Sequence, residues 1–320
     1  MEFLKTLCLT SSVSAHENGL ASLICKEVKD FADEVKVDNI GNVIVHKKGT
    51  AKRILFCTPM DECGGLVTFI EKSGKIRFSG IGHKEAETYL NCAVMFKNSV
   101  FGIVKCENKN LNELKFSDLY IDTVFSDISE IEKNIEIGDV FSFEPRYVEN
   151  NNKVITSAGS SKFCVYALCD AIKNIKNNDN DLYFIFATRG EEGNKGVKAA
   201  AEAIDADYII SSECCAVNDK NIKDDAGAII NVKDPSFICD KTLLNEIKEI
   251  LSDKKIKFTL VADVKKSSQA GAVWEHTGLK TACVCLPIRY SDDVYCLAQK
   301  NNISEFLKAS LEIAKMQLTF

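Results

Sequence analysis

The clearest hydrophobic pattern in the chain is the run Leu182–Ala187, where six apolar residues, several of them aromatic, follow one another without interruption. Such a run is typical of a strand buried on both faces, as in a sheet covered by helices. It ends abruptly in Arg189-Gly190-Glu191-Glu192-Gly193. Open α/β sheets place their chemistry at the carboxyl ends of central strands, so the acidic pair is a candidate site. It could equally be a solvated turn whose carboxylates favour the next helix N-terminus.

Alternating strand and helix patterns on both sides of this run indicate an α/β fold with a mainly parallel sheet and helices on both faces. The first part of the chain carries a helical pattern over residues 2–32 and then short strands, predicted at Glu34–Val37, Asn42–Val45 and Ile54–Cys57. The later part alternates to the C-terminus, with helices predicted at Lys162–Ile175, Gly196–Ile204, Leu243–Leu251, Ala270–Trp274 and Ile303–Met316. Its strands are predicted at Tyr208–Ser212, Ala228–Val232, Phe258–Val261 and Thr281–Leu286, the last of them stopped by Pro287.

Residues 66–149 have a different pattern of hydrophobic and polar positions. Short alternating segments separated by turns replace the helical periodicity, and only Ile128–Lys133 has a helical pattern. Many short strands at close spacing predict a small β-barrel, or a sandwich as the alternative. We therefore expect a discontinuous α/β domain made of residues 1–65 and 150–320, with residues 66–149 inserted as a β domain.

Composition narrows the function classes. The net charge of −6 argues against nucleic acid or an anionic membrane as the main partner, and no apolar run approaches the roughly 20 residues that span a bilayer. The N-terminal residues lack the pattern of a signal peptide. Most of the 14 cysteines lie in apolar runs, and none forms a Cys-x-x-Cys pair. Reduced core cysteines in a large chain predict a cytoplasmic protein.

Carboxylates follow several of the predicted strands and would gather at one edge of a parallel sheet. They are Asp61, Glu62, Glu191, Glu192, Glu213, Asp292 and Asp293. Such a set could hold a hard divalent cation through oxygen ligands. The plainer explanation is that strand ends are polar in any case.

Long stretches of the chain resemble the glutamyl aminopeptidase family of tetrahedral di-metal aminopeptidases, some of which are named cellulases or endoglucanases. The resemblance is carried by Pro59-Met60-Asp61-Glu62 and by the stretches DEVKVDNIGNVIVHKKG, IEIGDVFSFEP, DLYFIFATRGEEGNKGVKAA and SSQAGAVWEHTGLKTACVCLPIRY. It implies a zinc-peptidase-like fold, two zinc or cobalt ions, and homo-oligomers, dodecamers among them, assembled through the inserted domain.

The same resemblance shows losses at the positions that carry the chemistry. Pro59 stands where the family has its first histidine ligand, and Ser160 stands where it has the bridging aspartate. Gly190 takes the place of the general base, while the adjacent ligand Glu191 is kept. A general base alone contributes about 10²–10⁴ in rate, so catalysis of the family type is expected to be impaired or absent.

The remaining ligand positions offer oxygen only. Glu213 replaces an aspartate, Asp292 replaces the last histidine, and Asp61 keeps its place beside the lost first histidine. Zinc prefers imidazole and thiolate, whereas Glu191, Glu213 and Asp292 suit magnesium, calcium or manganese. We therefore expect no tightly bound cofactor and at most one weakly bound divalent cation.

Other residues near these positions leave alternatives open. Thiolates could replace the imidazoles, although core packing is the simpler role for Cys57, Cys63, Cys164, Cys214 and Cys215. A serine at 160 or 161 beside Lys162 could be a nucleophile with a lysine base, although serine is also a common helix N-cap. Of the four histidines none falls at a family ligand position, and His83 is expected in a surface loop. Two readings follow: a scaffold or peptide-binding protein with lost catalysis, or an active metallo-aminopeptidase with altered metal ligation.

Overall fold

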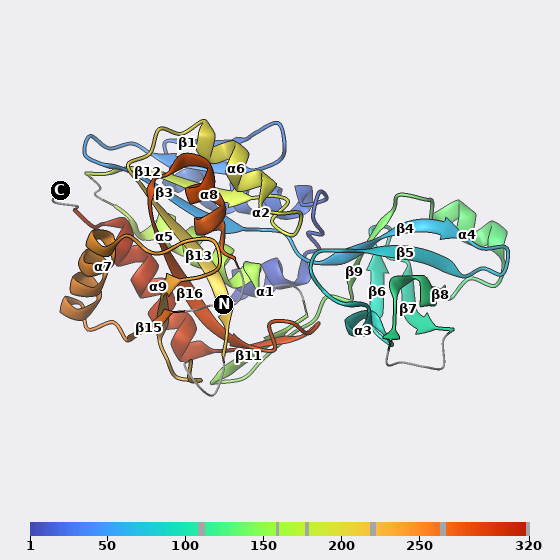
Figure 1. Cartoon of the computed structure of the whole chain (residues 1–320). Coiled ribbons are helices and arrows are strands. Elements are labelled where there is room, and N and C mark those ends of the chain that lie inside the picture. Colours follow the sequence, from blue (N-terminus) through green and yellow to red (C-terminus); the bar gives the residue numbers. More distant parts are fainter. Residues whose placement is uncertain (108–112, 158–159, 177–178, 218–221, 263–266, 318–320) are drawn as a thin grey trace.

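The structure is a computed structural model that describes residues 1–107, 113–157, 160–176, 179–217, 222–262 and 267–317. Figure 1 shows two bodies side by side, a larger α/β part and a smaller part made mostly of strands. The α/β part is built on a sheet that has 11 strands among the described residues. Among these residues no helix is both long and apolar enough to cross a bilayer.

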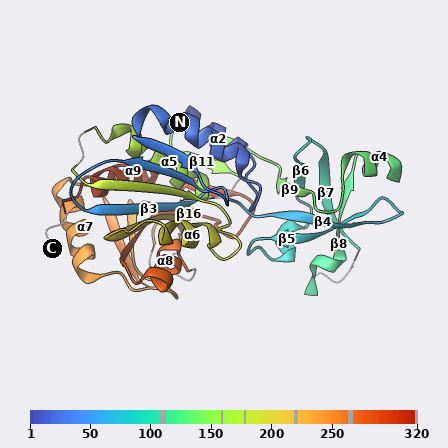
Figure 2. The same ribbon diagram turned by 90° about the horizontal axis from the view of Figure 1, so that it is seen from above.

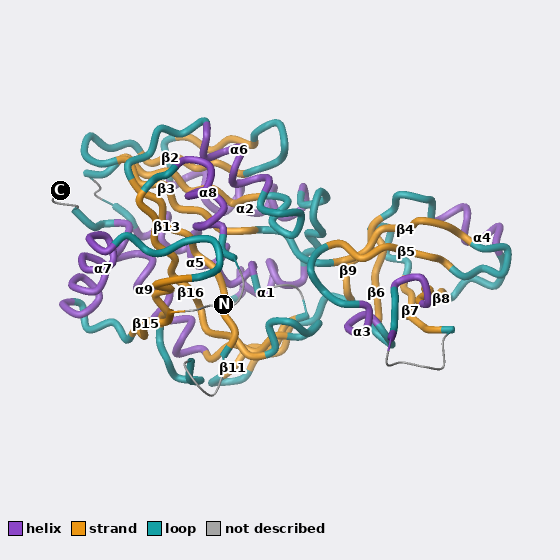
Figure 3. Tube along the Cα trace, in the orientation of Figure 1, coloured by secondary structure: helices purple, strands orange, loops and turns teal. Residues whose placement is uncertain are grey.

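The main path of the large sheet, whose strands are drawn in orange in Figure 3, runs in the order β1-β2-β12-β3-β13-β16-β17-β11-β10. Its strands are β1 (Glu34–Val37), β2 (Val43–Lys47), β3 (Arg53–Pro59), β10 (Tyr147–Glu149), β11 (Lys153–Thr156), β12 (Asp181–Ala187), β13 (Tyr208–Ala216), β16 (Lys280–Arg289) and β17 (Cys296–Gln299). Off this path, β14 (Ala228–Lys233) pairs with β16 and with β15 (Phe258–Ala262). The four central strands β12, β3, β13 and β16 run parallel, which confirms the expected α/β sheet.

The flanks of the sheet differ from this parallel centre. The pairs β1/β2, β2/β12, β16/β17, β11/β17 and β10/β11 are antiparallel, so the whole sheet is mixed. The prediction that Pro287 stops the strand is wrong, because β16 continues to Arg289. Pro287 lies between the stretch of β16 that pairs with β14 and the stretch that pairs with β17. A residue without an amide hydrogen is tolerated where one side of a strand has no partner.

Helices cover both faces of the sheet, as Figure 2 shows. One face carries α1 (Glu2–Leu9), α2 (Asn18–Val28), α5 (Ser161–Asn174), α7 (Lys241–Asp253) and α9 (Lys300–Ala314). The other face carries α6 (Lys195–Glu202) and α8 (Gln269–Thr277). The single helical pattern predicted over residues 2–32 proves to be α1, α2 and a short 3₁₀ turn η1 (Lys29–Phe31), with a non-helical stretch between α1 and α2.

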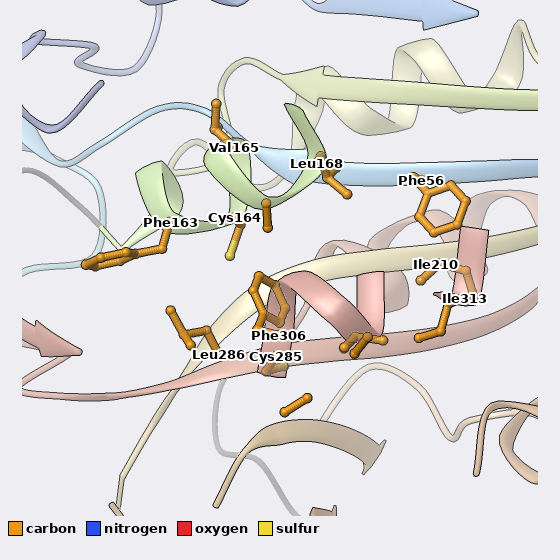
Figure 4. Close-up of a cluster of buried hydrophobic side chains, with 14 of the residues drawn as sticks. Phe56, Phe163, Cys164, Val165, Leu168, Ile210, Cys285, Leu286, Phe306 and Ile313 are labelled. Carbon is orange, nitrogen blue, oxygen red and sulfur yellow. The ribbon is translucent and has the colours of Figure 1, made fainter. Parts of the chain in front are cut away.

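The largest hydrophobic core lies between the sheet and the face that carries α5 and α9. In Figure 4, Phe163, Cys164 and Leu168 of α5 and Phe306 and Ile313 of α9 lie over the strands. These side chains are all buried. Because α5 is fixed by this packing, its N-terminus is held at the edge of the sheet where Ser160 lies.

The smaller part is a closed barrel with the strand order β4-β5-β8-β7-β6-β9. Its elements are β4 (Gly64–Ile70), β5 (Ile76–Ile81), α3 (Ala86–Tyr89), β6 (Ala93–Phe96), β7 (Phe101–Cys106), η3 (Phe116–Asp118), β8 (Leu119–Thr123), α4 (Ile128–Asn134) and β9 (Val140–Phe143). A separate core of aromatic and aliphatic side chains fills it. Closure removes the exposed strand edges that a small open sheet would present, and the predicted small barrel is confirmed. Within the predicted insert of residues 66–149, however, β10 pairs with β11 of the large sheet.

Candidate functional site

A cavity of about 750 Å³ opens at the carboxyl edge of the parallel strands. Every position that the family resemblance assigned to the site lines it: Pro59, Asp61, Ser160, Gly190, Glu191, Glu213 and Asp292. Glu192, the other half of the acidic pair, does not line it and pairs with Arg189 and Lys195. The positions that line the cavity come from the ends of β3, β12, β13 and β16 and from the start of α5, which are far apart in the chain. The sheet topology therefore brings these positions to one place.

The turn after β12 is fixed by an unusual backbone conformation. Arg189 and Asn194 have φ values of 53° and 58°, in the left-handed region that residues other than glycine rarely adopt. The Arg189 amide donates a hydrogen bond to Glu17 Oε1 at 2.9 Å, which holds the turn to the loop before α2. Gly190 and Glu191 are presented to the cavity by this turn.

Gly190 leaves room for the carboxylate of Asp61. A Cβ atom at Gly190 would lie 2.6 Å from Asp61 Oδ1 and 3.2 Å from Pro59 Cβ. Asp61 is only 3% exposed, and its Oδ2 accepts a hydrogen bond from the Glu191 amide at 2.9 Å. Burial raises the pKa of Asp61 to about 7. In this chain the space beside position 190 is therefore occupied by a buried carboxyl group.

Glu191 is held from the barrel side. His83, in the loop after β5, places Nδ1 2.6 Å from Glu191 Oε2. Burial alone would raise the pKa of Glu191, but the hydrogen bond and charge of His83 outweigh burial and lower it. Cys63 Sγ lies 3.9 Å from the same nitrogen. These three groups lie within 4.8 Å of one another, and no other set of three such side chains among the described residues lies as close together.

Glu213 points toward the N-terminus of α8. Its Oε1 accepts hydrogen bonds from the Ser211 hydroxyl and from the Gln269 amide, the latter at 2.7 Å. Burial raises the pKa of Glu213 to about 7. Amides at a helix N-terminus favour an anionic acceptor, so the helix partly offsets the cost of burying this carboxylate.

The remaining positions contribute little donor chemistry. Pro59 has no side-chain donor, and the hydroxyl of Ser160 makes no capping hydrogen bond at the start of α5. The Asp292 carbonyl accepts from Lys84 Nζ at 3.2 Å, which ties the loop after β16 to the barrel loop that follows His83. Oxygen is thus the only ligand atom supplied by the aligned positions.

The suggested serine nucleophile lacks a lysine partner among the described contacts. Lys162 is fully buried and is not among the residues that line the cavity; its Nζ contacts the Ser12 hydroxyl and lies 3.4 Å from Glu62 Oε2. Ser161 instead donates to the Asp61 carbonyl at 2.8 Å. The lysine therefore anchors the N-terminal loop and the stretch after β3.

The thiols near the site are uncharged core groups. Cys164 and Cys214 lie with their sulfur atoms 3.7 Å apart, and Cys214 donates to the Ser160 carbonyl at 3.3 Å. Burial raises the pKa of Cys57 and of both these thiols. Cys63 differs from them because it stands beside an imidazole and a carboxylate.

The sequence missed His83 as a member of the site. It was expected in a surface loop, and the side chain is indeed 46% exposed, yet it faces the cavity. The sequence hint was a glycine, Gly82, directly before His83 at the end of a barrel strand. In the structure this glycine has a φ of 96°, which marks a sharp turn there. Nothing in the local pattern could connect His83 with Glu191, which lies 108 positions later.

Comparisons with known proteins give a consistent result. A profile of the M42 glutamyl aminopeptidase family matches residues 41–308. A protein of Acetivibrio thermocellus that is provisionally named an aminopeptidase is 31% identical over 97% of each chain. Lysyl aminopeptidase of Pyrococcus furiosus is 25% identical over 96% of this chain and 94% of its own.

Solved structures agree with the sequence comparisons. The Pyrococcus horikoshii TET1 peptidase, described as assembling into a tetrahedron or a large octahedral shell, matches with a TM-score of 0.89 at 26% identity, covering 99% of both chains. A TET aminopeptidase from a marine sediment archaeon of the Thaumarchaeota matches with a TM-score of 0.91 at 21% identity, covering 98% of this chain and 96% of that one.

Proposed function

Because this chain belongs to the M42 glutamyl aminopeptidase family, we propose that it keeps the family's scaffold and cavity as a peptide-binding protein while lacking the family's two-metal hydrolysis. The observation that carries the proposal is the pair Gly190 and Asp61. Asp61 Oδ1 lies 2.6 Å from the place where the first atom of a side chain at 190 would be, which is too close for that atom to fit without a shift. The position of the general base is therefore without a base and is also closed to one.

The donor set supports the same proposal. Two cations held for hydrolysis need a bridging carboxylate that keeps them about 3.5–4 Å apart, and Ser160 offers only a hydroxyl at that position. Pro59 offers no ligand atom, and Glu213 is engaged by Ser211 and Gln269. The residues at the aligned positions do not fit a pair of zinc ions, so we derive no catalytic step through them.

A peptide with a free amino terminus is the ligand that the cavity favours. Its walls carry the carboxylates Asp61, Glu191, Glu213 and Asp292, and the lysine that approaches, Lys84, is held by the carbonyls of Asp292 and Asp293. An ammonium group gains from an acidic, partly desolvated pocket. The volume of about 750 Å³ lies within the range of about 300–1,000 Å³ usual for ligand sites.

Calorimetric titration with short peptides tests this proposal. A peptide with a free amino terminus should bind more tightly than its N-acetylated form, and mass spectrometry should find both intact. Asp292→Asn should weaken binding of the free peptide, whereas Asp30→Asn, at an exposed position outside the cavity, should leave it unchanged. Equal affinity for both peptides, or no binding, would reject the peptide-binding role.

A second candidate is an active hydrolase with altered metal ligation. The observation that favours it is the approach of Cys63 and His83 to Glu191, which brings a thiol and an imidazole to the cavity from outside the family positions. The two candidates are distinguished by mass spectrometry of the peptide after incubation. An active hydrolase would shorten the peptide, and a chelator would stop that shortening.

We further propose that the chain self-associates through its barrel, as the family resemblance implies. The TET1 peptidase is described as assembling into a tetrahedron or a large octahedral shell, and most of the barrel extends away from the α/β body (Figure 1). Light scattering at micromolar concentration should give a mass that is a multiple of 35.4 kDa. A strict monomer would contradict this proposal.

A further inference from the structure

Three potential ligands from separate segments meet at the junction of the two bodies. Cys63 directly precedes β4, His83 follows β5, and Glu191 follows β12. The first two belong to the base of the barrel, and the third belongs to the α/β part. We propose that Cys63, His83 and Glu191 bind one divalent transition-metal cation, with zinc as the best match, and that this cation fastens the barrel to the edge of the sheet.

The distances between the three ligand atoms are close to those of a zinc site. In a tetrahedral zinc site with the usual bond lengths, neighbouring ligand atoms stand about 3.3–3.6 Å apart. Here Cys63 Sγ lies 3.9 Å from His83 Nδ1, which in turn lies 2.6 Å from Glu191 Oε2. An opening of the imidazole–carboxylate pair by about 1 Å, with the thiol closing on both partners from within 4.8 Å, would reach that geometry.

The backbone of Gly82 makes this approach feasible. A Cβ atom there would lie 2.6 Å from Cys63 Sγ and 2.7 Å from Glu191 Oε2. Its φ of 96° also favours glycine. The absence of a side chain at Gly82 thus lets Cys63 and Glu191 approach each other closely. The positive φ of Gly82 is a separate observation that favours glycine at this place.

Donor type and charge select the cation. One thiolate, one imidazole and one carboxylate suit zinc, since soft and borderline ligands favour it over magnesium or calcium. The thiolate and the carboxylate together balance the two charges of the ion. A bound cation would displace the proton of the Cys63 thiol.

The surroundings leave a fourth position for water. His83 and Glu191 both line the cavity, and the His83 side chain is 46% exposed. Lys84 opposes a cation, but its ammonium group is directed toward the carbonyls of Asp292 and Asp293. Three protein ligands and one open position are within the usual pattern of zinc coordination.

This inference goes beyond the proposed function and does not depend on it. Of the three residues, only Glu191 occupies a position at which the family resemblance places a ligand, so the site is a different one. A cation here would act first on the orientation of the barrel, whether or not the cavity takes a peptide. Failure of the peptide titration would leave it untouched.

Metal analysis of the full chain tests the proposal. After incubation with zinc and dialysis, the wild type should retain one ion per chain. Cys63→Ser and His83→Ala should each lower zinc affinity by more than about 100-fold, because loss of a ligand exceeds the roughly 10–100-fold effect of losing a group that only supports one. The matched controls are Cys92→Ser in the barrel and His276→Ala on α8, neither of which lines the cavity; both should bind like the wild type.

Cobalt supplies a second readout that does not depend on stability. The cobalt form of the wild type should show a thiolate-to-metal charge-transfer band in the near ultraviolet, and Cys63→Ser should lose that band while circular dichroism stays unchanged. A wild type that retains no ion would overturn the proposal. So would undiminished zinc binding by both Cys63→Ser and His83→Ala, which would place the ion among the other cavity thiols.

Discussion

A methyl group added at position 190 tests whether Asp61 fills the space of the missing base. In Gly190→Ala the new carbon would lie 2.6 Å from Asp61 Oδ1, whereas ordinary contacts begin at 3.4 Å, so the oxygen must retreat by 0.8 Å. Asp61 is 3% exposed and has little room to do so. Its retreat would also stretch the 2.9 Å bond from the Glu191 amide.

The expected magnitude follows from these two effects. Overpacking a buried site costs about 1–3 kcal/mol, and a lost hydrogen bond adds about 1 kcal/mol. We expect Gly190→Ala to lower the free energy of unfolding by about 2–4 kcal/mol. In an Asp61→Ala background the same change should cost less than about 1 kcal/mol, because the clashing oxygen is gone.

Urea denaturation of the four proteins of this cycle measures the effect. Gly19→Ala is the matched control, since its Cβ would have only Thr10 Cγ2 nearby, at 3.8 Å, and should leave stability unchanged or raise it by up to about 1 kcal/mol. Equal costs of Gly190→Ala in the two backgrounds would refute the reasoning. If the clash is real, Gly190→Glu meets it too, and a base cannot be restored by that single change.

Two further predictions concern ion pairs that involve none of the aligned site positions. Lys162 is fully buried and lies 3.4 Å from Glu62, so Lys162→Met should cost about 3–5 kcal/mol in urea denaturation by leaving a buried carboxylate unpaired; a change below about 1 kcal/mol would contradict this. Burial alone would raise the pKa of Asp181, but hydrogen bonds from His46 at 2.6 Å and Arg53 at 2.7 Å lower it below 3.8. A carboxyl group whose pKa is lower in the folded than in the unfolded state stabilises the fold at pH values above its unfolded pKa. Asp181→Asn should therefore lower the free energy of unfolding most near neutral pH, and progressively less as the pH falls below 3.8. A difference in unfolding free energy that does not change with pH would contradict this prediction.

The sequence predicts the scaffold well because its signals are local. The apolar run at Leu182–Ala187 predicts a central strand. The change from helical periodicity to short alternating segments at about residue 66 predicts the barrel. Site positions at strand ends, such as Pro59, Glu191 and Glu213, line one cavity because parallel strands end at the same edge. Each of these inferences needs only periodicity, strand direction or a resemblance.

The features that the sequence does not predict depend on distant contacts. Nothing near Gly190 indicates that Asp61 stands 2.6 Å from its absent side chain. Similarly, the meeting of His83 with Glu191 requires the relative placement of the barrel and the sheet. Pro287 continues a strand because one flank of β16 changes its partner there, which is a property of the neighbours and not of the proline.

The most direct measurement is turnover of a panel of aminoacyl and peptide substrates by the unmodified protein with zinc, cobalt or manganese supplied. The absence of a base at Gly190 and of a bridging carboxylate at Ser160 act on the same step, so either loss should be severe. The account predicts no release of amino acids above the uncatalysed background with any of the three metals. Robust turnover that a chelator abolishes and added metal restores would contradict it.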